Sequence, residues 1–168
     1  ENKENIKISE YKNSKKNNKD ESINSLIDLN NAFFGGGYFL EISRDYKFCK
    51  PLVVYNYFSN NLKNTIINNK NSIVLNENSN LDLIEFNLDI SSSNFIHNNH
   101  TNIIISKNAS LKNYTIQGCK SNCFYYKFVK SKLDKKSNYE DYIFLSGLKF
   151  SRTEEDIDID GENANCIV

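Results

Sequence analysis

Short apolar stretches of four to eight residues alternate with polar turns from Phe33 to the end of the chain. They are rich in Ile, Val, Tyr and Phe, which fit the half-buried surface of a pleated sheet. No helical period of useful length interrupts them, so this region is predicted to be all β. Before it, Ser22 could cap a helix, and Ile23, Leu26 and Ile27 follow at i, i+3, i+4 spacing. This spacing predicts one short amphipathic helix.

An internal repeat is the most informative feature of the chain. Each copy is a strand, a polar turn with Asn before a small residue, and a second strand. The copies are SIVLNENSNLDLIEF from Ser72, NIIISKNASLKNYTI from Asn102 and DIDIDGENANCIV from Asp156. The turn residues are Asn78, Asn108 and Asn163, with Lys136 in a weaker copy, so the spacings are 30, 28 and 27 residues. A period of this length indicates stacked units, which means a β-helix or a sandwich of regular hairpins.

The N-terminal segment differs from the rest of the chain. Residues 1–21 are Lys, Asn, Glu and Ser with almost no large apolar side chain. Such a stretch cannot bury enough surface to offset its ordering entropy, so it is predicted to be a disordered linker. Residues 22–168 are assigned to one β-helical core domain that continues beyond Val168.

Composition and charge exclude several functions. The 21 basic and 21 acidic residues balance, so no basic excess is present to hold a nucleic acid. The longest apolar runs, 51–55 and 103–105, are far shorter than the ~20 residues of a membrane span. Four cysteines in 168 residues are too few for a disulfide scaffold, which favours a reducing compartment. The chain also contains 29 asparagines, which is typical of an AT-rich genome.

An acidic strand near the C-terminus is the first candidate for chemistry. Asp156, Asp158 and Asp160 alternate with Ile157 and Ile159. In a strand the three carboxylates lie on one face, roughly 6.6 Å apart. They could form a cation site or an acid–base pair, as in β-helical polysaccharide enzymes. A solvated strand face whose charges discourage aggregation is the favoured interpretation.

A cysteine and histidine set is the second candidate. Cys119 and Cys123 form a C-x3-C pair in a predicted turn, and the only histidines, His97 and His100, lie in a different predicted turn about one repeat earlier. Because turns one repeat apart stack in a β-helix, these four side chains could meet as a zinc site. Zinc sites usually have C-x2-C or C-x4-C spacing, so unpaired, ordinary residues are the favoured interpretation.

The remaining special residues have plain structural explanations. Cys49 and Cys166 are expected to pack as small hydrophobic side chains. The run Gly35–Gly37 is followed by neither Lys-Ser/Thr nor a helix, so a tight turn or a close backbone approach is expected. No nucleophile–base arrangement can be proposed. We therefore assign no catalytic, cofactor-binding or metal-binding residue and expect no free-standing enzyme.

Four segments, in order, resemble the SufD subunits of the SUF iron–sulfur cluster assembly machinery. They are LNNAFFGGGYFLEISRDYKFCKPLVVYNYF, NSIVLNENSNLDLIEFNLDI, NFIHNNHTNIIISKNASLKNYTIQ and FLSGLKFSRTEEDIDIDGENANC. In the last of these, Arg152 precedes an Asp-Gly-Glu turn at 160–162. The resemblance extends from Leu29 to Val168. SufB is similar in fold but has a Cys at the position of Asn87, which favours SufD over SufB.

The resemblance implies a right-handed parallel β-helix with repeats of about 27–30 residues. It also implies a non-catalytic scaffold that pairs with a SufB-like subunit and a SufC-like ATPase. Clusters are then assembled on the complex, and this segment binds no cofactor, nucleic acid or membrane. The functional residues of the family lie beyond Val168. The composition suggests a plastid of the apicoplast type, with a bacterial-type cytoplasm as the alternative.

Two other functions stay open from the sequence. One is a β-helical polysaccharide-active enzyme or surface adhesin, which would need a secretion signal, and the start of the sequence shows none. The other is an Asn-rich structural domain with no connection to iron.

Overall fold

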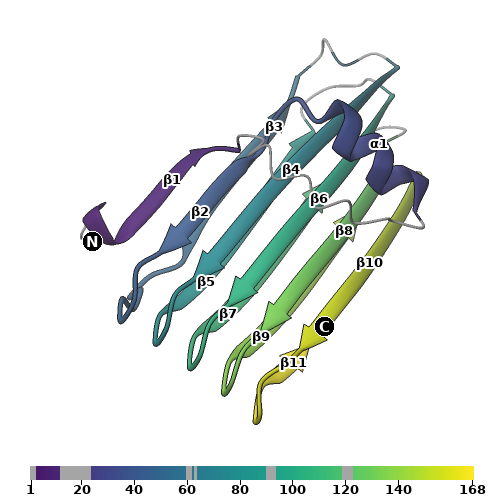
Figure 1. Cartoon of the computed structure of the whole chain (residues 1–168). Coiled ribbons are helices and arrows are strands. Elements are labelled where there is room, and N and C mark those ends of the chain that lie inside the picture. The colour runs from purple at the N-terminus through teal and green to yellow at the C-terminus, as the bar shows by residue number, and fades with distance from the viewer. Residues whose placement is uncertain (1–2, 12–23, 60–61, 63, 90–93, 119–122) are drawn as a thin grey trace.

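The computed structural model describes residues 3–11, 24–59, 62, 64–89, 94–118 and 123–168 (Figure 1). Its helical elements are the 3-10 turn η1 (Lys3–Asn5) and helix α1 (Ser25–Phe33). The strands are β1 (Ile6–Glu10), β2 (Tyr38–Ile42), β3 (Leu52–Phe58), β4 (Thr65–Leu75), β5 (Asn80–Asp89), β6 (Phe95–Ile105), β7 (Ser110–Gly118), β8 (Cys123–Leu133), β9 (Asn138–Ser146), β10 (Phe150–Ile159) and β11 (Asn165–Ile167). Neither described helix is long and apolar enough to cross a membrane.

The strands form two stacked sheets. Sheet A has the order β1-β2-β4-β6-β8-β10, and sheet B has the order β3-β5-β7-β9-β11. All pairs are parallel except β1 with β2. The chain passes from one sheet to the other at every turn, so each repeat adds one strand to each sheet. The result is a β-solenoid of about 4 turns, which confirms the predicted parallel β-helix.

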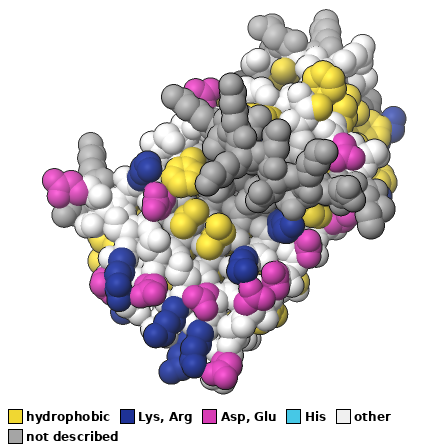
Figure 2. Space-filling view, viewed as in Figure 1, with side chains coloured by type: hydrophobic (Ala, Val, Ile, Leu, Met, Phe, Trp, Pro, Cys, Tyr) yellow, Lys and Arg dark blue, Asp and Glu magenta, His cyan; other side chains and the backbone are white. Residues whose placement is uncertain are grey.

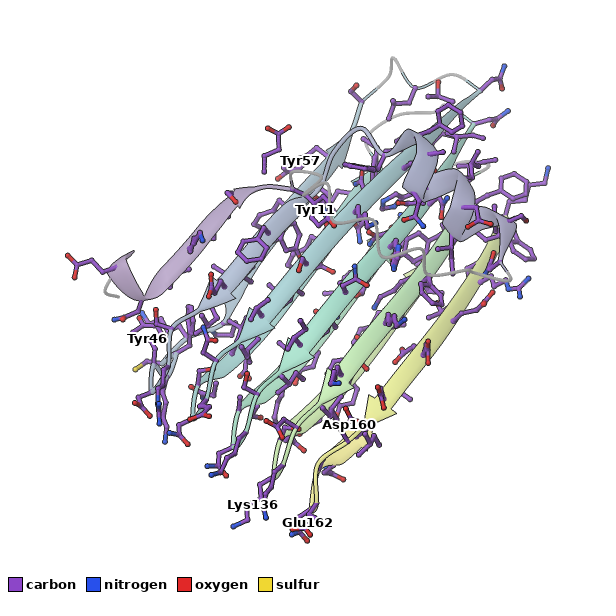
Figure 3. All side chains as sticks on the ribbon, in the orientation of Figure 1. Tyr11, Tyr46, Tyr57, Lys136, Asp160 and Glu162 are labelled. Atoms are coloured by element: carbon purple, nitrogen blue, oxygen red, sulfur yellow. The ribbon has the colours of Figure 1, made fainter. Side chains whose placement is uncertain are left out.

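The turn residues of the repeat stack in a left-handed backbone conformation. Asn78, Asn108, Lys136 and Asn163 have φ angles of 60°, 56°, 57° and 59°. The Asn108 amide donates to Asn78 Oδ1 at 2.9 Å, so successive turns are also joined by their side chains. Lys136 and Glu162 lie at the tips of neighbouring turns (Figure 3). Asn tolerates this conformation better than most residues, which confirms the predicted repeat and its cause.

The pairing places like residues above one another inside the solenoid. Leu75, Ile105, Leu133 and Ile159 occupy one row of sheet A, and the first three are fully buried. With the Leu81 and Leu111 side chains of sheet B, the three buried residues belong to the apolar cluster next to the Asn turns.

Helix α1 lies on the outer face of sheet A (Figure 1). Buried amides hold it there. The Asn30 side chain donates to the backbone carbonyls of Asn69 and Asn98, both at 2.9 Å. In return, the Asn98 side chain donates to the Leu26 carbonyl at 2.9 Å. The helix thus satisfies polar groups of the sheet that it covers.

The start of the helix differs from the sequence prediction. Ser22 is not the N-cap, because the helix begins at Ser25 and the Asn24 side chain accepts a hydrogen bond from the Leu26 amide at 3.0 Å. Ser22 lies outside the described residues. Asn caps a helix as well as Ser does, and Glu154 additionally binds the Asn24 amide.

The N-terminal segment also differs from its prediction as a disordered linker. Residues 6–10 form β1, which pairs antiparallel with β2, and Ile6 packs against the core. The available backbone edge of β2 stabilises a strand that has little apolar surface of its own. Residues 12–21 lie outside the described part of the chain.

The turn geometry generates a stability prediction. Asn108→Ala should lower the free energy of unfolding by about 1–2 kcal/mol, because alanine resists a positive φ and loses the Asn78 contact. Lys136→Gly should raise it by about 1 kcal/mol, because the strain of an ordinary side chain there is removed. Urea unfolding of the full-length protein measures both changes. A destabilising Lys136→Gly would contradict the explanation.

Candidate functional site

The middle of the interior is polar, and it lies between the apolar cluster next to the Asn turns and a second apolar cluster of Phe58, Phe95 and Cys123. Its side chains point between the sheets and are almost fully buried. We call the following set the polar interior: Asn71, Glu85, Asn87, His97, Asn99, Thr101, Asn113, Thr115, Gln117, Lys127 and Asp141.

An ion pair across the sheets lies at the centre of the polar interior. Lys127 of β8 in sheet A places its Nζ 2.8 Å from Asp141 Oδ2 of β9 in sheet B. The same Nζ donates to Thr115 Oγ1 at 3.1 Å, and Asn113 Nδ2 donates to Asp141 Oδ1 at 2.9 Å. The Lys127 and Asp141 side chains are 1% and 0% exposed. This fully buried, hydrogen-bonded pair therefore joins the two sheets.

A second carboxyl group lies close to the same lysine. The Tyr38 hydroxyl donates to Glu85 Oε1. Burial raises the pKa of Glu85, although the Tyr38 hydrogen bond and the Lys127 charge oppose this. Burial and the neighbouring Glu85 also raise the pKa of Tyr38 well above its ordinary value. Proton binding to Glu85 is therefore favoured in the folded state.

Glu155 of β10 adds a third carboxyl group at the edge of the polar interior. Burial, and then the charge of Asp141, raise its pKa to about 7. The charge of Lys127 lowers the pKa of Glu155, but this offsets only part of the increase. One buried cation thus faces three carboxyl groups, and the folded protein holds protons that an unfolded chain would release near neutral pH.

The side chains of His97 and His100 do not meet and cannot form one site. They lie on strand β6 rather than in a turn, and a spacing of three places them on opposite faces of sheet A. His97 packs inside between Phe58 and Tyr125, with ring centroids 4.8 and 5.3 Å away. Burial lowers the pKa of His97 to about 4, and the neighbouring Gln117 acts weakly in the opposite direction. His97 is therefore neutral.

The possible zinc site is not formed by the residues that the structure describes. Cys123 opens β8 and pairs in register with Phe95, not with either histidine. No group of three His, Cys, Asp or Glu side chains suited to a metal ion occurs among the described residues. Cys119 lies outside them.

The acidic strand is a solvated face, as favoured from the sequence. Asp156, Asp158 and Asp160 are exposed, while Ile157 packs against the core. Their neighbours on β8 are lysines, and Lys132 Nζ lies 2.6 Å from Asp160 Oδ2. On the face seen in Figure 2, basic and acidic side chains are interspersed rather than separated. Asp160 therefore takes part in a cross-strand ion pair, while Asp156 and Asp158 lie beside Lys130 and Lys132 in the strand register.

Of the remaining residues, Cys49 is exposed, so its prediction as a core residue is wrong. It follows β2 in an irregular segment that carries its side chain away from the interior. Cys166 is partly buried against the core, as expected.

Gly37 has φ +133°, and a Cβ there would lie 1.9 Å from the Lys70 carbonyl oxygen. The expected close backbone approach is therefore confirmed.

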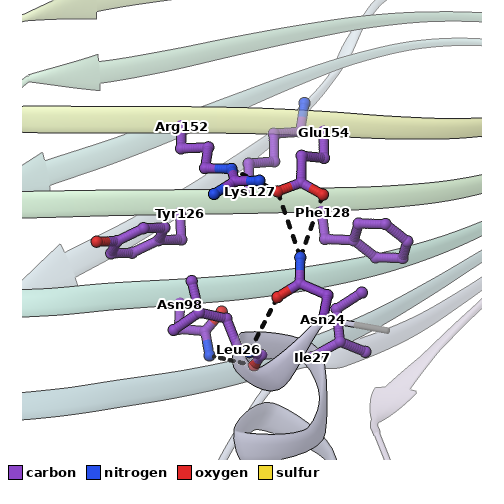
Figure 4. Close-up of a pocket in the computed structure, with 9 residues that line it drawn as sticks. All are labelled: Asn24, Leu26, Ile27, Asn98, Tyr126, Lys127, Phe128, Arg152 and Glu154. Carbon is purple, nitrogen blue, oxygen red and sulfur yellow. Dashed lines mark hydrogen bonds and ion pairs between the residues drawn. The ribbon is translucent and has the colours of Figure 1, made fainter. Parts of the chain in front are cut away.

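A small pocket lies beside the first turn of α1 (Figure 4). Polar side chains that line this pocket bind one another through hydrogen bonds and an ion pair. Glu154 accepts from the Asn24 amide at 3.1 Å and forms an ion pair with Arg152 Nε at 2.5 Å. These contacts fasten the start of α1 to β10, so the pocket serves to anchor the helix.

The polar interior was not predicted from the sequence. Its signal is the presence of polar side chains at the inward positions of successive repeats, such as Glu85, Thr115 and Asn113. Without the register, these positions cannot be told from solvent-facing ones, because both give the same alternation.

The two stacked parallel sheets and the turn repeat define a β-solenoid domain. Its residues 57–168 match the family described as SUF system FeS cluster assembly, SufBD core domain. Because the match covers about two thirds of the chain, the protein belongs to the SufBD core domain family and takes part in FeS cluster assembly by the SUF system. No curated protein matches the sequence.

The buried ion pair leads to a stability prediction. Lys127→Met should lower the free energy of unfolding by about 3–5 kcal/mol, because Asp141 is left buried without its cation. Adding Asp141→Leu should recover most of this loss, since neither charge is then buried alone. Urea unfolding of the full-length protein measures both variants. A double variant as unstable as Lys127→Met would show that the pair is not the cause.

The raised pKa of Glu155 leads to a pH prediction. Since the folded pKa lies above the ordinary value, the stability that proton binding contributes is present below about pH 4.5 and is lost as the pH rises through about 7. Glu155→Gln should therefore match the wild type below about pH 4.5 and melt a few degrees higher at pH 8. Asp156→Asn, an exposed neighbour, is the control and should show no such pH-dependent gain. Equal melting curves of Glu155→Gln and wild type at pH 8 would contradict the prediction.

Proposed function

We propose that the chain is a SufD-type scaffold subunit that performs no catalysis itself. It pairs with a SufB-like subunit and a SufC-like ATPase, and iron–sulfur clusters are assembled on the complex. The membership in the SufBD core domain family is the observation that carries this proposal.

The environment of Asn87 supports the SufD type. Asn87 is buried in the polar interior, and its Oδ1 accepts a hydrogen bond from Asn56 Nδ2 at 2.9 Å. By the resemblance, SufB subunits have a cysteine at this position. A buried amide that is engaged with its neighbour offers no thiolate for iron or sulfur.

The use of the buried charges supports a structural role. Lys127 forms an ion pair with Asp141 and donates a hydrogen bond to Thr115, and Glu85 accepts a hydrogen bond from the Tyr38 hydroxyl. These groups connect the two sheets and hold the solenoid in one shape. The acidic strand, which is the only candidate for polysaccharide chemistry in the sequence, lies in register with Lys130 and Lys132, and Asp160 forms an ion pair with Lys132.

We place the protein in a plastid of the apicoplast type. The abundance of Asn and Lys supports an AT-rich genome, which parasites with a relict plastid share with some bacteria. A bacterial-type cytoplasm is the alternative.

Co-expression tests the proposed function. The tagged full-length protein should co-purify with its SufB-like and SufC-like partners as one stable complex. The ATPase activity of this complex should disappear when the SufC-like chain is replaced by a variant that cannot hydrolyse ATP, because the scaffold contributes no catalysis.

A matched pair of glycine variants controls for the integrity of the scaffold. A Cβ at Gly161 would lie 2.0 Å from the Lys135 backbone nitrogen, whereas one at Gly35 meets nothing within 4 Å. Gly161→Ala should reduce partner recovery, and Gly35→Ala should not. Recovery of a SufD-like chain in place of a SufB-like one would assign the protein to the SufB type instead. Failure to recover either partner, with all chains soluble, would overturn the scaffold proposal.

A further inference from the structure

Strand β10 connects the polar interior with helix α1. Neighbouring residues of a strand point to opposite faces of their sheet, and β10 carries two carboxyl groups in succession. Glu155 points inward, where burial and the charge of Asp141 act on it. Glu154 points outward, where it binds the Asn24 side chain. The two carboxyl groups therefore link the inside of the solenoid to the helix on its outer surface.

The surroundings of Glu155 oppose a negative charge. Four titratable groups face it, and they are Asp141 and Tyr139 of β9, Lys127 of β8 and Cys166 of β11. Lys127 is the only cation among these four, and its Nζ already lies 2.8 Å from Asp141 Oδ2. An ionised Glu155 would thus stand beside the Asp141 carboxylate without a cation of its own.

The protonated form of Glu155 has the opposite relation to Asp141. Its hydroxyl hydrogen is donated to the Asp141 carboxylate, so proton binding holds β10 against β9. Loss of the proton replaces this hydrogen bond by repulsion between two carboxylates. Because the pKa of Glu155 is raised to about 7, the exchange takes place close to neutral pH.

On the outer face, Glu154 reaches the start of α1 (Figure 4). Asn24 Nδ2 donates to Glu154 Oε2 at 3.1 Å, while Asn24 Oδ1 accepts from the Leu26 amide at 3.0 Å and caps the helix. Arg152 Nε lies 2.5 Å from Glu154 Oε1 and fixes this carboxylate from the same strand. A shift of β10 would therefore carry Glu154 away from the helix cap.

Helix α1 depends on such attachments. It is nine residues long, which is shorter than the ~12–15 residues below which an isolated helix is marginal in water. Only Ile27 and Asn30 of the helix are buried, and Phe33 is 69% exposed. Its hold on sheet A thus relies on a few hydrogen bonds, including the one through Asn24, and the loss of one of them favours release.

We propose that β10 and α1 form one proton-sensitive unit, in which a proton on Glu155 keeps both elements in place and its loss loosens both. Opening of this unit would uncover the half-buried rings of Tyr126 and Phe128, which lie beside Leu26 and Ile27 of the helix. The inference uses only groups of this chain, so it does not depend on the proposed scaffold function.

Hydrogen exchange of the purified full-length protein tests the proposal. Protection factors, which correct for the intrinsic effect of pH on exchange, are measured for β10 and α1 at about pH 5 and about pH 8. The opening constant of both elements should rise at least about tenfold over this range, because opening returns Glu155 to its ordinary pKa. The two elements should share one opening constant, larger than that of β4 and β6.

Three variants separate the steps of the proposal. Glu155→Gln should remove the pH dependence from both elements, because nothing titrates at this position. Asp156→Asn is the matched control, since Asp156 is the exposed next residue of β10, and it should keep the dependence. Glu154→Ala breaks the contact with Asn24, so β10 should still loosen with pH while α1 is loose at both pH values.

Each of four results would overturn the proposal. The first is a wild type in which β10 and α1 are equally protected at both pH values. The second is a pH dependence that survives in Glu155→Gln. The third is an α1 that still follows pH in Glu154→Ala, since the helix would then not be coupled through this contact. The fourth is an opening constant of β10 and α1 equal to that of β4 and β6, which would mean that the whole solenoid unfolds.

Discussion

The in-register stacking of successive turns is the constraint on which the rest of the structure depends. Each strand of the solenoid obtains its backbone hydrogen bonds from the turns before and after it, so no repeat is stable alone. A slip of one residue in any strand would exchange its inward and outward side chains. The left-handed turn residues, from Asn78 to Asn163, fix this register. The buried ion pair and the rows in which Asp156 and Asp158 lie beside lysines both follow from it.

The polar interior shows how a parallel solenoid accommodates charge. A purely apolar interior would exclude water more simply, yet Lys127, Asp141 and Glu85 lie at its centre. Their burial is tolerated because Lys127 bonds to Asp141 and Thr115 across the sheets, and Glu85 accepts a hydrogen bond from Tyr38 of the opposite sheet. Such a network ties sheet A to sheet B at one particular alignment, which apolar side chains specify less strictly. For a scaffold that presents surfaces to other subunits, a fixed alignment of the two sheets is useful.

Much of the fold could be predicted from the sequence, whereas its interior could not. Asn78, Asn108 and Asn163 revealed the repeat, because only a few residue types suit a positive φ. The alternation in the acidic strand placed its carboxylates correctly. Lys127 and Asp141 were missed because a charged residue in an alternating strand is expected to face water. His97 and His100 were assigned to a turn because the strand that contains them is rich in asparagine. Strand β1 was missed because its stability comes from the edge of β2 and not from its own side chains.

The antiparallel strand β1 has a consequence for how solenoids meet end to end. The first coil of a parallel β-helix offers a template on which the last coil of another molecule can add, in the same direction and register, and so elongate a fibril. On sheet A, β1 occupies that template with a strand of the opposite direction. Parallel, in-register continuation of sheet A therefore ends at β2, because the next strand beyond it among the described residues runs the other way.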